Sequence, residues 1–513
     1  MCCSHASALS HARRAAASAQ ASRRTHMGHM HPRPRAWRVG LAHWLLALAA
    51  LAVALRLGAG ERLASCELDA DLLASLRNEL AQWRHSGIDV QHMRDLSKVC
   101  PEWQDDLVLH CAAKYERMTI DNNEVFMTSL APRPAGQGYP PPYLTVTGVL
   151  LELYETAQKY KLPNVDLTFA FGDREPWFAL GSGPESVQRR ATPILTFFKG
   201  RESVSAIRVP DSGRYRCELD GVDVLLAKQS ALLADPPWDR RNATPFAHDT
   251  LFCTTCHPKV IMEDGSELPA CVRTHLQSLS HQKPELFDYS SEPRPLIDFR
   301  KNRYVVSSDG FSATAKYEKM YTMGSLVLKS RSACFGWFYD TMKPYKHYVP
   351  LFVKHLADIF DVVKWLREHD KEAEAIAKAG TERASKILSK EARMCFWKTL
   401  IDEIASLQTY RPSCRLHKMC VPLKKELDFH GVYELCPALN IHQAVDEIHG
   451  EKLDHGPGIE HWGAAWGSFE NASHGYPGWF MHEDDVELLP NETIRDWKPP
   501  AWAAKWTPLD LQI

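Results

Sequence analysis

Apolar and polar positions alternate with two different periods along most of the chain after residue 143. Short apolar runs rich in β-branched and aromatic residues predict strands, and stretches with apolar residues three and four positions apart predict helices. Strands that alternate with helices form parallel sheets, so two such sets predict an α/β protein with two Rossmann-like domains. The predicted strands are 165–171, 194–198, 246–252, 304–308, 325–329 and 347–351, and the predicted helices are 147–160, 222–233, 270–279, 312–323, 358–369 and 372–388.

The flanking segments follow other patterns. Residues 68–84 have the spacing of an amphipathic helix, and 118–127 is typical of a hairpin that turns at Asp121-Asn122-Asn123. We therefore expect a stem and N-terminal cap before the two domains and an extension of unknown role after them, rich in Trp and His. The expected boundaries are 60–142 for the stem and cap, 143–235 and 236–410 for the two domains, and 411–513 for the extension.

The N-terminal end has the pattern of a membrane anchor. Residues 1–39 have the composition of a basic tail, and 40–59 are apolar over about the length of one bilayer span, apart from His43 and Arg56. Arginines before this segment predict a cytoplasmic N-terminus and a single-pass type II protein. A cleaved signal peptide with an extended basic region, or a plastid transit peptide, are the competing interpretations.

Cysteines and glycosylation signals favour an oxidising lumen of the ER or Golgi. Twelve of the 14 cysteines follow residue 59, and three Asn-x-Ser/Thr signals occur there, at Asn242, Asn471 and Asn491. The formal net charge of −2 argues against nucleic acid as a partner.

Connectivity of the cysteines cannot be deduced from the sequence. The candidate partners are Cys100, Cys111, Cys414, Cys420 and Cys436. The segment Cys253-Thr-Thr-Cys256-His257 matches a haem-attachment pattern, and such pairs also occur in redox and zinc sites. A disulfide, with Cys271 as one candidate partner, is the default interpretation, and no metal site is expected. A haem or redox protein built on this segment is a distant alternative.

A candidate anion site lies in 304–329. The predicted strand ends at Ser308 and is followed by a turn at Gly310, and Ser312 or Thr314 is expected to cap a helix that Gly324 ends. This helix carries Lys316 and Lys319. Backbone N–H groups at a helix start, together with lysines, suit a diphosphate.

Several motifs around this site resemble one known family. They are Asp309-Gly310, Gly324-Ser325-Leu326-Val327, Trp337-Phe338-Tyr339, Lys343-Pro344 and His347-Tyr348-Val349-Pro350. Their order and spacing are similar to those of the capsule-associated glycosyltransferases (glycosyltransferase family 90), which include the Rumi-type protein O-glucosyltransferases. The resemblance extends from about Tyr143 to Gln408. It implies a GT-B fold, in which two Rossmann-like domains face each other across a cleft and the second binds the donor.

The resemblance also implies a reaction and roles for residues. Such an enzyme moves glucose or xylose from a UDP-sugar to a hydroxyl of a protein or glycan acceptor, with inversion and without a metal or other cofactor. Asp173 follows the predicted strand 165–171 and matches the family's catalytic aspartate, and Glu175 is the fallback base. Lys316 matches a nucleotide-contacting arginine of Rumi-like enzymes. A lysine supplies charge there without a bidentate fork.

One stretch departs from the family pattern. Where the family usually shows Phe-Arg-Gly with a donor-binding arginine, this chain has Phe246-Ala247-His248-Asp249. His248, Arg273 or a residue of another loop supplies the missing charge, or transfer is weak or lost. In the latter case the alternative is a non-catalytic lumenal module that binds a glycan or a nucleotide sugar. The candidate nucleotide-sugar-binding residues are Lys316, Ser308, Gly310, Ser312, Lys319 and His248.

Overall fold

The protein is described here by a computed structural model, and the described part of the chain lies within residues 66–507. No helix of this described part is long and apolar enough to cross a membrane, and the expected span 40–59 lies outside it. The described residues are 66–94, 115–129, 142–170, 193–200, 205–210, 221–251, 260–291, 296–310, 312–417, 419–424, 427, 480–481, 497–505 and 507.

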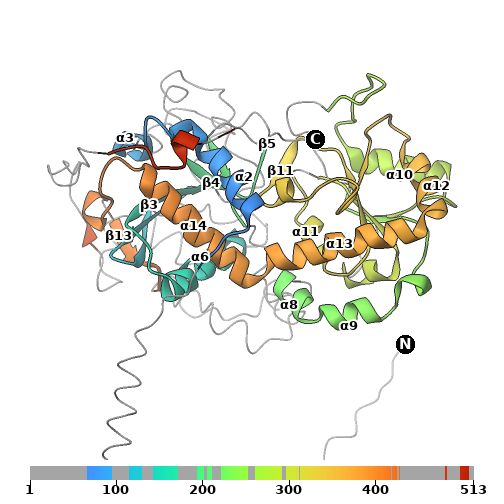
Figure 1. The fold of residues 1–513 in the computed structure, drawn as a ribbon, viewed down its shortest axis with the longest axis horizontal. Coiled ribbons are helices and arrows are strands. Elements are labelled where there is room, and N and C mark those ends of the chain that lie inside the picture. Colours follow the sequence, from blue (N-terminus) through green and yellow to red (C-terminus); the bar gives the residue numbers. More distant parts are fainter. Residues whose placement is uncertain are drawn as a thin grey trace, which may run out of the picture. The chain divides into compact units, whose positions relative to one another are not determined.

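Seven of the described strands form a mixed sheet (Figure 1). Its order is β14-β13-β2-β1-β3-β4-β6. The strands β3, β4 and β6 are parallel, whereas β1 is antiparallel to β2 and β3, and β13 is antiparallel to β2 and β14. The bounds are β1 (Tyr115–Asp121), β2 (Glu124–Ser129), β3 (Val165–Ala170), β4 (Ile194–Thr196), β6 (Ala206–Arg208), β13 (Met419–Pro422) and β14 (Phe480–Met481).

The expectation of a wholly parallel first sheet is therefore wrong. The predicted hairpin is present, and Asn122 and Asn123 adopt φ values of 52° and 70° at its turn. Asparagine tolerates this left-handed region, which a two-residue hairpin turn requires. The hairpin adds its strands to the edge of the sheet beyond β3, so this half is antiparallel.

Helices α2 (Ala70–Leu80), α6 (Pro142–Lys159) and α14 (Lys390–Leu407) pack around the first sheet. The sequence analysis predicted α2 and α6 but not α14. Residues 393–397 of α14 are all buried, so the helix shows no polar face over this turn. A helix buried all round lacks the periodic signal on which the prediction depends.

Five of the described strands form a second sheet in which every pair is parallel, as predicted. Its order is β12-β10-β9-β7-β8. Both faces are covered, because Phe246 and Val305 belong to one core cluster and Ala247 and Val306 to the other. The bounds are β7 (Phe246–His248), β8 (Asp288–Ser290), β9 (Tyr304–Ser307), β10 (Leu326–Ser330) and β12 (Val349–Leu351).

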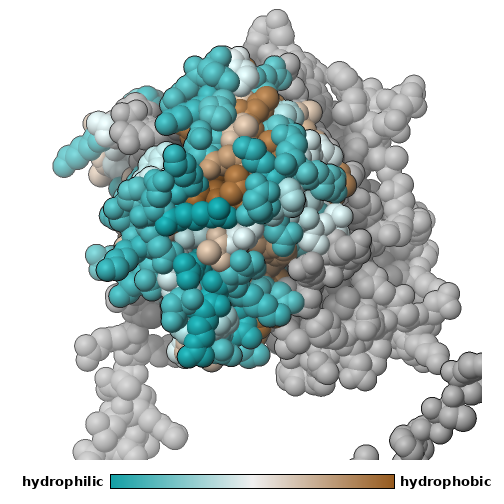
Figure 2. Space-filling model, turned by 90° about the vertical axis from the view of Figure 1, so that its right-hand side faces the viewer, coloured by the Kyte–Doolittle hydropathy of each residue, from teal (hydrophilic) through white to brown (hydrophobic). Residues whose placement is uncertain are grey.

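The helices of this half lie on opposite faces of the second sheet. Buried side chains of α10 (Val272–Gln282) and α12 (Ile359–Glu368) share a core cluster with Ala247, and those of α11 (Lys316–Tyr321) share the other with Phe246. Seen from the side on which α10 and α12 lie in Figure 1, the surface is mainly hydrophilic and encloses an apolar strip (Figure 2).

A pair of long helices connects the two halves. Helix α13 (Asp370–Leu388) contacts α11 and β10, whereas α14 contacts α6 and β3 (Figure 1). Ser389 separates them, and its Oγ accepts a hydrogen bond from the N–H of Ala392 at 3.2 Å. Buried charges add further connections: Arg208 of β6 donates to Glu79 of α2 and to Asp340 of a short 3-10 helix.

Several predicted elements have different bounds. The predicted strand 194–198 is two short strands, and the helix 222–233 is divided at Lys228. The strand 246–252 ends at His248. The remaining elements are β5 (Phe198–Gly200), paired with β11 (Cys334–Gly336), and helices α3 (Val90–Arg94), α8 (Val222–Ala227) and α9 (Gln229–Ala234). The 3-10 helices are η2 (Ala81–Trp83), η5 (Trp238–Arg240), η6 (Leu296–Lys301), η7 (Tyr339–Thr341), η8 (Cys414–Leu416) and η9 (Ala503–Lys505).

Disulfides confirm part of the cysteine interpretation. Cys414 pairs with Cys420, as one of the predicted combinations, and Cys271 is disulfide-bonded. The bond between Cys66 and Cys395 was not predicted, because its partners lie 329 residues apart. The remaining candidates, Cys100, Cys111, Cys253, Cys256 and Cys436, lie outside the described residues.

Candidate functional site

The order of the second sheet defines the place where a ligand is expected. From β7 the chain moves outward to β8, and from β9 it moves the other way to β10 and β12. Loops that follow β7 and β9 therefore diverge, and the carboxyl ends of strands at such a switch point are the usual ligand site of an open α/β sheet. Asp249 follows β7 directly, and Ser308 follows β9.

Asp249 is the centre of this site. Its side chain is 1% exposed, and its Oδ1 accepts a hydrogen bond from Nζ of Lys316 at 2.5 Å. Its Oδ2 accepts from Oγ of Ser308 at 2.6 Å. The Lys316 ammonium also donates to the carbonyl oxygen of His248 at 2.5 Å. One buried carboxylate thus holds Ser308, which follows β9, and Lys316, which begins α11, beside the end of β7.

Arg273 adds a second cation from the first turn of α10. Its Nη1 donates to the carbonyl oxygen of Thr250 at 3.0 Å, and its Nη2 donates to that of Ser308 at 3.5 Å. The same Nη2 lies 3.7 Å from Oδ1 of Asp249. A Cβ atom at Gly310 would lie 2.6 Å from this nitrogen, so a glycine is needed for the guanidinium to lie there.

Two cations and one carboxylate meet in this site. Lys316 and Arg273 share the single carboxylate of Asp249. Beside them, Nζ of Lys329 lies 2.9 Å from Oδ1 of Asp309, which forms a balanced pair. Two cations placed side by side at a strand end can make charge-assisted hydrogen bonds to an anionic ligand.

Tyr289 borders the cluster. Its hydroxyl donates to the carbonyl oxygen of Asp249 at 3.2 Å. Burial, and then the negative charge of Asp249, raise the pKa of Tyr289 well above its ordinary value. The phenol therefore stays protonated and donates this bond throughout the neutral range.

The structure brings four of the predicted donor-site residues together. Lys316 and Ser308 bind the Asp249 carboxylate, and Gly310 makes room for Arg273. The Nδ1 atom of His248 lies 3.1 Å from the carbonyl oxygen of Ser290, at the carboxyl end of β8. His248 is the last residue of β7, and the other three belong to the connection from β9 into α11, so all four lie at the carboxyl ends of these strands.

The other two predicted residues are Ser312, which precedes α11, and Lys319, which lies within it. α11 is shorter than the predicted helix. α11 begins at Lys316 instead of residue 312, and the side chain of Ser312 does not cap it. The N–H of Thr314 donates to Oδ1 of Asp309 at 3.0 Å, and Oγ1 of Thr314, the other predicted cap, accepts from the N–H of Lys316 at 3.4 Å. Lys319 lies within α11 and is 7% exposed.

Other predicted site residues fall outside the described part of the chain. These are Asp173, Glu175, Asn471 and Asn491. The strand β3 before Asp173 is described and ends at Ala170. Asn242 is described and exposed, and its Oδ1 accepts from the N–H of Thr244 at 3.0 Å.

Sequence reasoning missed the roles of Asp249 and Lys329. Asp249 follows the end of β7 directly, but the predicted strand 246–252 placed it inside a strand, where no ligand-binding role is expected. Lys329 lies near the end of β10, and its Nζ is 5.3 Å from the ring centre of Tyr317 and 5.7 Å from that of Tyr339. Such aromatic contacts depend on packing between distant segments and leave no local signal.

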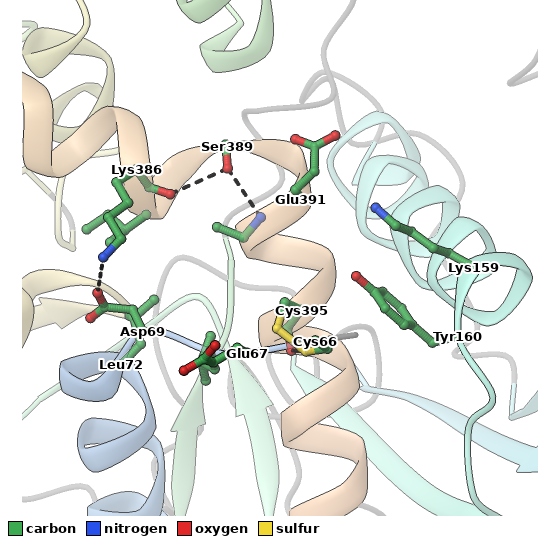
Figure 3. Close-up of a pocket in the computed structure, with 13 residues that line it drawn as sticks. Cys66, Glu67, Asp69, Leu72, Lys159, Tyr160, Lys386, Ser389, Glu391 and Cys395 are labelled. Atoms are coloured by element: carbon green, nitrogen blue, oxygen red, sulfur yellow. Dashed lines mark hydrogen bonds and ion pairs between the residues drawn. A yellow bond between two sulfur atoms is a disulfide. The ribbon is translucent and has the colours of Figure 1, made fainter. Parts of the chain in front are cut away.

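A separate cavity of about 360 Å³ lies at the disulfide between Cys66 and Cys395 (Figure 3). Lys159 and Tyr160 line it from the end of α6, and Ser389 lines it from the start of α14. None of the predicted site residues borders it. Across the part of the chain that the structure describes, no group of three or more His, Cys, Asp or Glu side chains is arranged to hold a metal ion.

Two solved structures show limited similarity to this chain. A glycosyltransferase from Rickettsia africae aligns over 53% of this chain and 84% of its own, with a TM-score of 0.26 and 11% identity. HepE of Anabaena in complex with UDP aligns over 35% of this chain and 53% of its own, with a TM-score of 0.22 and 12% identity. Scores this low do not establish a common architecture.

Curated relatives match over limited segments. Protein O-glucosyltransferase 3 of Mus musculus is 32% identical over 166 residues, which are 29% of this chain and 33% of the relative. Protein O-glucosyltransferase 1 of Rattus norvegicus is 25% identical over 224 residues, which are 44% of this chain and 55% of the relative. The chain thus spans between about a third and about half of the length of these relatives.

A protein-family model covers a larger part of the chain than these relatives do. The model of glycosyl transferase family 90 matches residues 144–426, which is more than half of the chain. This range contains both the predicted strand before Asp173 and the whole Asp249 cluster. The match confirms the resemblance that the motifs indicated, and this chain belongs to glycosyl transferase family 90.

Proposed function

We propose that this protein is a glycosyltransferase of the GT-B type that moves glucose or xylose from a UDP-sugar to a hydroxyl of a protein or glycan acceptor. One observation carries the proposal. Lys316 and Arg273 converge on one carboxylate at the switch point of a parallel sheet, where a nucleotide diphosphate is expected. The donor binds to the domain formed by residues 236–410, and the acceptor side is 143–235.

The proposed reaction is a single displacement with inversion and without a metal. Asp173 accepts the proton of the acceptor hydroxyl, whose oxygen forms a bond to the anomeric carbon of the sugar. The bond from that carbon to the diphosphate breaks, and UDP leaves with the bonding electrons. Lys316 offsets the charge that develops on the leaving group, because a positioned cation stabilises a transition state more than the ground state.

We also propose that the protein is a single-pass type II membrane protein of the ER or Golgi, with residues 1–39 in the cytoplasm, 40–59 in the membrane and the rest in the lumen. Its support is the charge pattern at the N-terminus, together with the disulfides of Cys66 with Cys395 and of Cys414 with Cys420. Disulfides persist in the secretory pathway and are rare in the cytosol.

A second candidate function is a lumenal module that binds a glycan or a nucleotide sugar without catalysis. The observation in its favour is the stretch from Phe246 to Asp249, which has no arginine. Donor binding without turnover is the property that separates this candidate from the enzyme.

The test is release of UDP by the detergent-solubilised full-length protein from a panel of UDP-sugars, with UDP binding measured by calorimetry. We expect release from UDP-glucose or UDP-xylose. Asp173→Asn removes the base at constant size, so transfer falls by about two to four powers of ten while UDP binding persists. Lys316→Ala instead weakens UDP binding by about 10- to 100-fold.

The outcomes separate the candidates. UDP binding without turnover of any donor favours the binding module, and absence of UDP binding contradicts both. If Asp173→Asn transfers at the parent rate, the base lies elsewhere, and Glu175→Gln is the next variant to measure.

A further inference from the structure

Arg273 reaches the carboxyl end of β7 from a different element of the chain. The residues at that end, from Phe246 to Asp249, include no arginine. The guanidinium of Arg273 nevertheless lies beside them, because α10 begins on the same edge of the sheet and Nη1 bonds the carbonyl oxygen of Thr250.

We propose that Arg273 is the second cation that binds the donor diphosphate, opposite Lys316, and that Gly310 is a glycine because the guanidinium occupies the space of its side chain. This inference rests on the proposed function and adds a specific residue to it. Arg273 contributes a planar fork that suits phosphate oxygens, and Lys316 contributes a point charge.

The guanidinium of Arg273 is held in place before any ligand binds. The carbonyl oxygens of Thr250 and Ser308 accept from its two terminal nitrogens, and Asp249 lies 3.7 Å from one of them. Since these partners belong to the loops after β7 and β9, the arginine is held across the switch point. A charged group that is already ordered loses less entropy when a ligand binds.

The charges explain why an anion is the expected ligand. Asp249 is 1% exposed, whereas the side chains of Arg273 and Lys316 are 10% and 28% exposed. The two cations therefore share a carboxylate that water does not reach, while they themselves lie nearer to solvent. An anion on the solvent side can therefore approach both cations.

Gly310 provides a way to move the guanidinium without removing it. A Cβ atom there would lie 2.6 Å from Nη2 and 2.7 Å from Cζ and Nη1 of Arg273. These atoms are the far end of a flexible side chain, so Gly310→Ala displaces the guanidinium at little cost to the backbone. The Gly310→Ala variant leaves Arg273 in place and does not change the net charge of the protein.

The experiment measures the dissociation constant of UDP for the full-length protein by calorimetry. The variants are Arg273→Gln, Arg273→Lys, Gly310→Ala, the double variant Arg273→Gln/Gly310→Ala and Lys316→Ala. Arg303→Gln is the matched control. Arg303 forms an ion pair of 3.0 Å with Asp370 and lies just before β9, at the amino ends of the strands and thus away from the proposed site. Urea unfolding of each variant verifies that the fold is retained.

Arg273→Gln is expected to weaken UDP binding by about 10- to 100-fold, and Arg273→Lys by less, since it keeps the charge. Gly310→Ala weakens binding in the parent but has no further effect in the Arg273→Gln background, because both changes remove the same contact. Arg303→Gln leaves the dissociation constant unchanged.

Failure of the inference and failure of the proposed function give different results. If Lys316→Ala weakens UDP binding and Arg273→Gln does not, the inference is overturned and the proposed function stands. If the effects of Arg273→Gln and Gly310→Ala add, Gly310 does not act through Arg273. If the parent protein binds no UDP, the proposed function and the inference both fail.

Discussion

The guanidinium group of Arg393 lies 3.2 Å from the carboxylate of Glu152, and neither side chain is exposed to solvent. Asp223 of α8 accepts two further hydrogen bonds from Arg393, and Glu152 belongs to α6, so this arginine of α14 connects three helices. Although burial alone would lower the pKa of Arg393, the two carboxylates raise it above its ordinary value.

Arg393→Met is therefore expected to lower the free energy of unfolding by about 3–5 kcal/mol, because it leaves Glu152 buried without its counter-charge. Urea unfolding measures the change. Asp223→Asn is the comparison and should cost less, since the Asp223 side chain is 35% exposed. An Arg393→Met variant as stable as the parent would show that Glu152 is neutral or finds another partner.

Asp249→Asn removes the carboxylate that Lys316 and Arg273 share. We expect a loss of about 3–5 kcal/mol in the free energy of unfolding, because the substitution breaks the ion pairs of a buried carboxylate. Added UDP should raise the melting temperature of this variant more than that of the parent, since the anion replaces the lost charge.

Asp370→Asn is the control for this variant. Asp370 pairs with Arg303 at the other edge of the sheet and is 38% exposed, so its loss should cost less than about 1 kcal/mol. Equal effects of the two substitutions would show that the switch point holds no concentrated positive charge.

His347 should make stability depend on pH. Its Nδ1 accepts from the N–H of Lys343 at 2.9 Å, which requires a neutral ring. Burial, and then the charges of Lys346 and Arg383, lower the pKa of His347 from 6.5 to about 4. The unfolded chain thus takes up a proton that the folded protein does not. The stabilisation is complete above pH 6.5 and is lost as the pH falls from about 6.5 to about 4.

His347→Asn tests this sign, because the amide oxygen can accept the same hydrogen bond without titrating. Urea midpoints measured from pH 7.5 to 4.5 should fall less steeply for the variant than for the parent. His281→Asn, at an exposed position of α10, should follow the parent curve. A parallel shift of the His347→Asn curve would mean that His347 does not titrate in this range.

The disulfides Cys66–Cys395 and Cys414–Cys420 should differ in their contribution to stability. Cys66 and Cys395 are separated by 329 residues, and Cys414 and Cys420 by 6. A cross-link restricts the unfolded chain more when its loop is longer. Replacing Cys66 and Cys395 by serine should therefore lower the free energy of unfolding by about 2–5 kcal/mol, and the same change at Cys414 and Cys420 should cost less. The reverse order would contradict the loop argument.

Asn242 should carry an N-glycan if the chain is lumenal. The side chain is exposed, and its Oδ1 bonds the N–H of Thr244 in a tight turn. Intact-mass analysis of protein from a secretory host should show one glycan fewer for Thr244→Val and an unchanged number for Thr244→Ser. A parent protein without any endoglycosidase-sensitive mass would argue against the proposed topology.

The parts of the fold that could be predicted depend on local signals. Gly324 has φ of +72°, and it ends the helix region where the sequence analysis placed the stop. The strands on either side, β9 and β10, were predicted to within one residue. The prediction of each strand depends on a short apolar run next to a glycine turn. Both signals lie within a few neighbouring residues.

The parts that could not be predicted depend on distant contacts. Asp309 rather than Ser312 accepts the hydrogen bond from Thr314, because Lys329 of the next strand holds the Asp309 carboxylate beside that turn. Arg273 reaches the switch point only because α10 begins beside the carboxyl end of β7. For the same reason the sequence named Arg273 only as an alternative source of the missing charge, and His248 was the residue placed in the predicted site.

The mixed first sheet has a consequence for the order in which the newly made chain can fold. β13 extends the sheet by pairing Val421 with Met127 of β2, and Tyr410 donates to the buried carboxylate of Asp166 in β3. At about 5–20 residues per second, synthesis reaches β13 roughly 10–40 s after β6 has been made. During this interval the edge of β2 lacks its partner strand. Such an open edge can pair with other chains, so a chaperone that shields it is expected to improve the yield of folded protein.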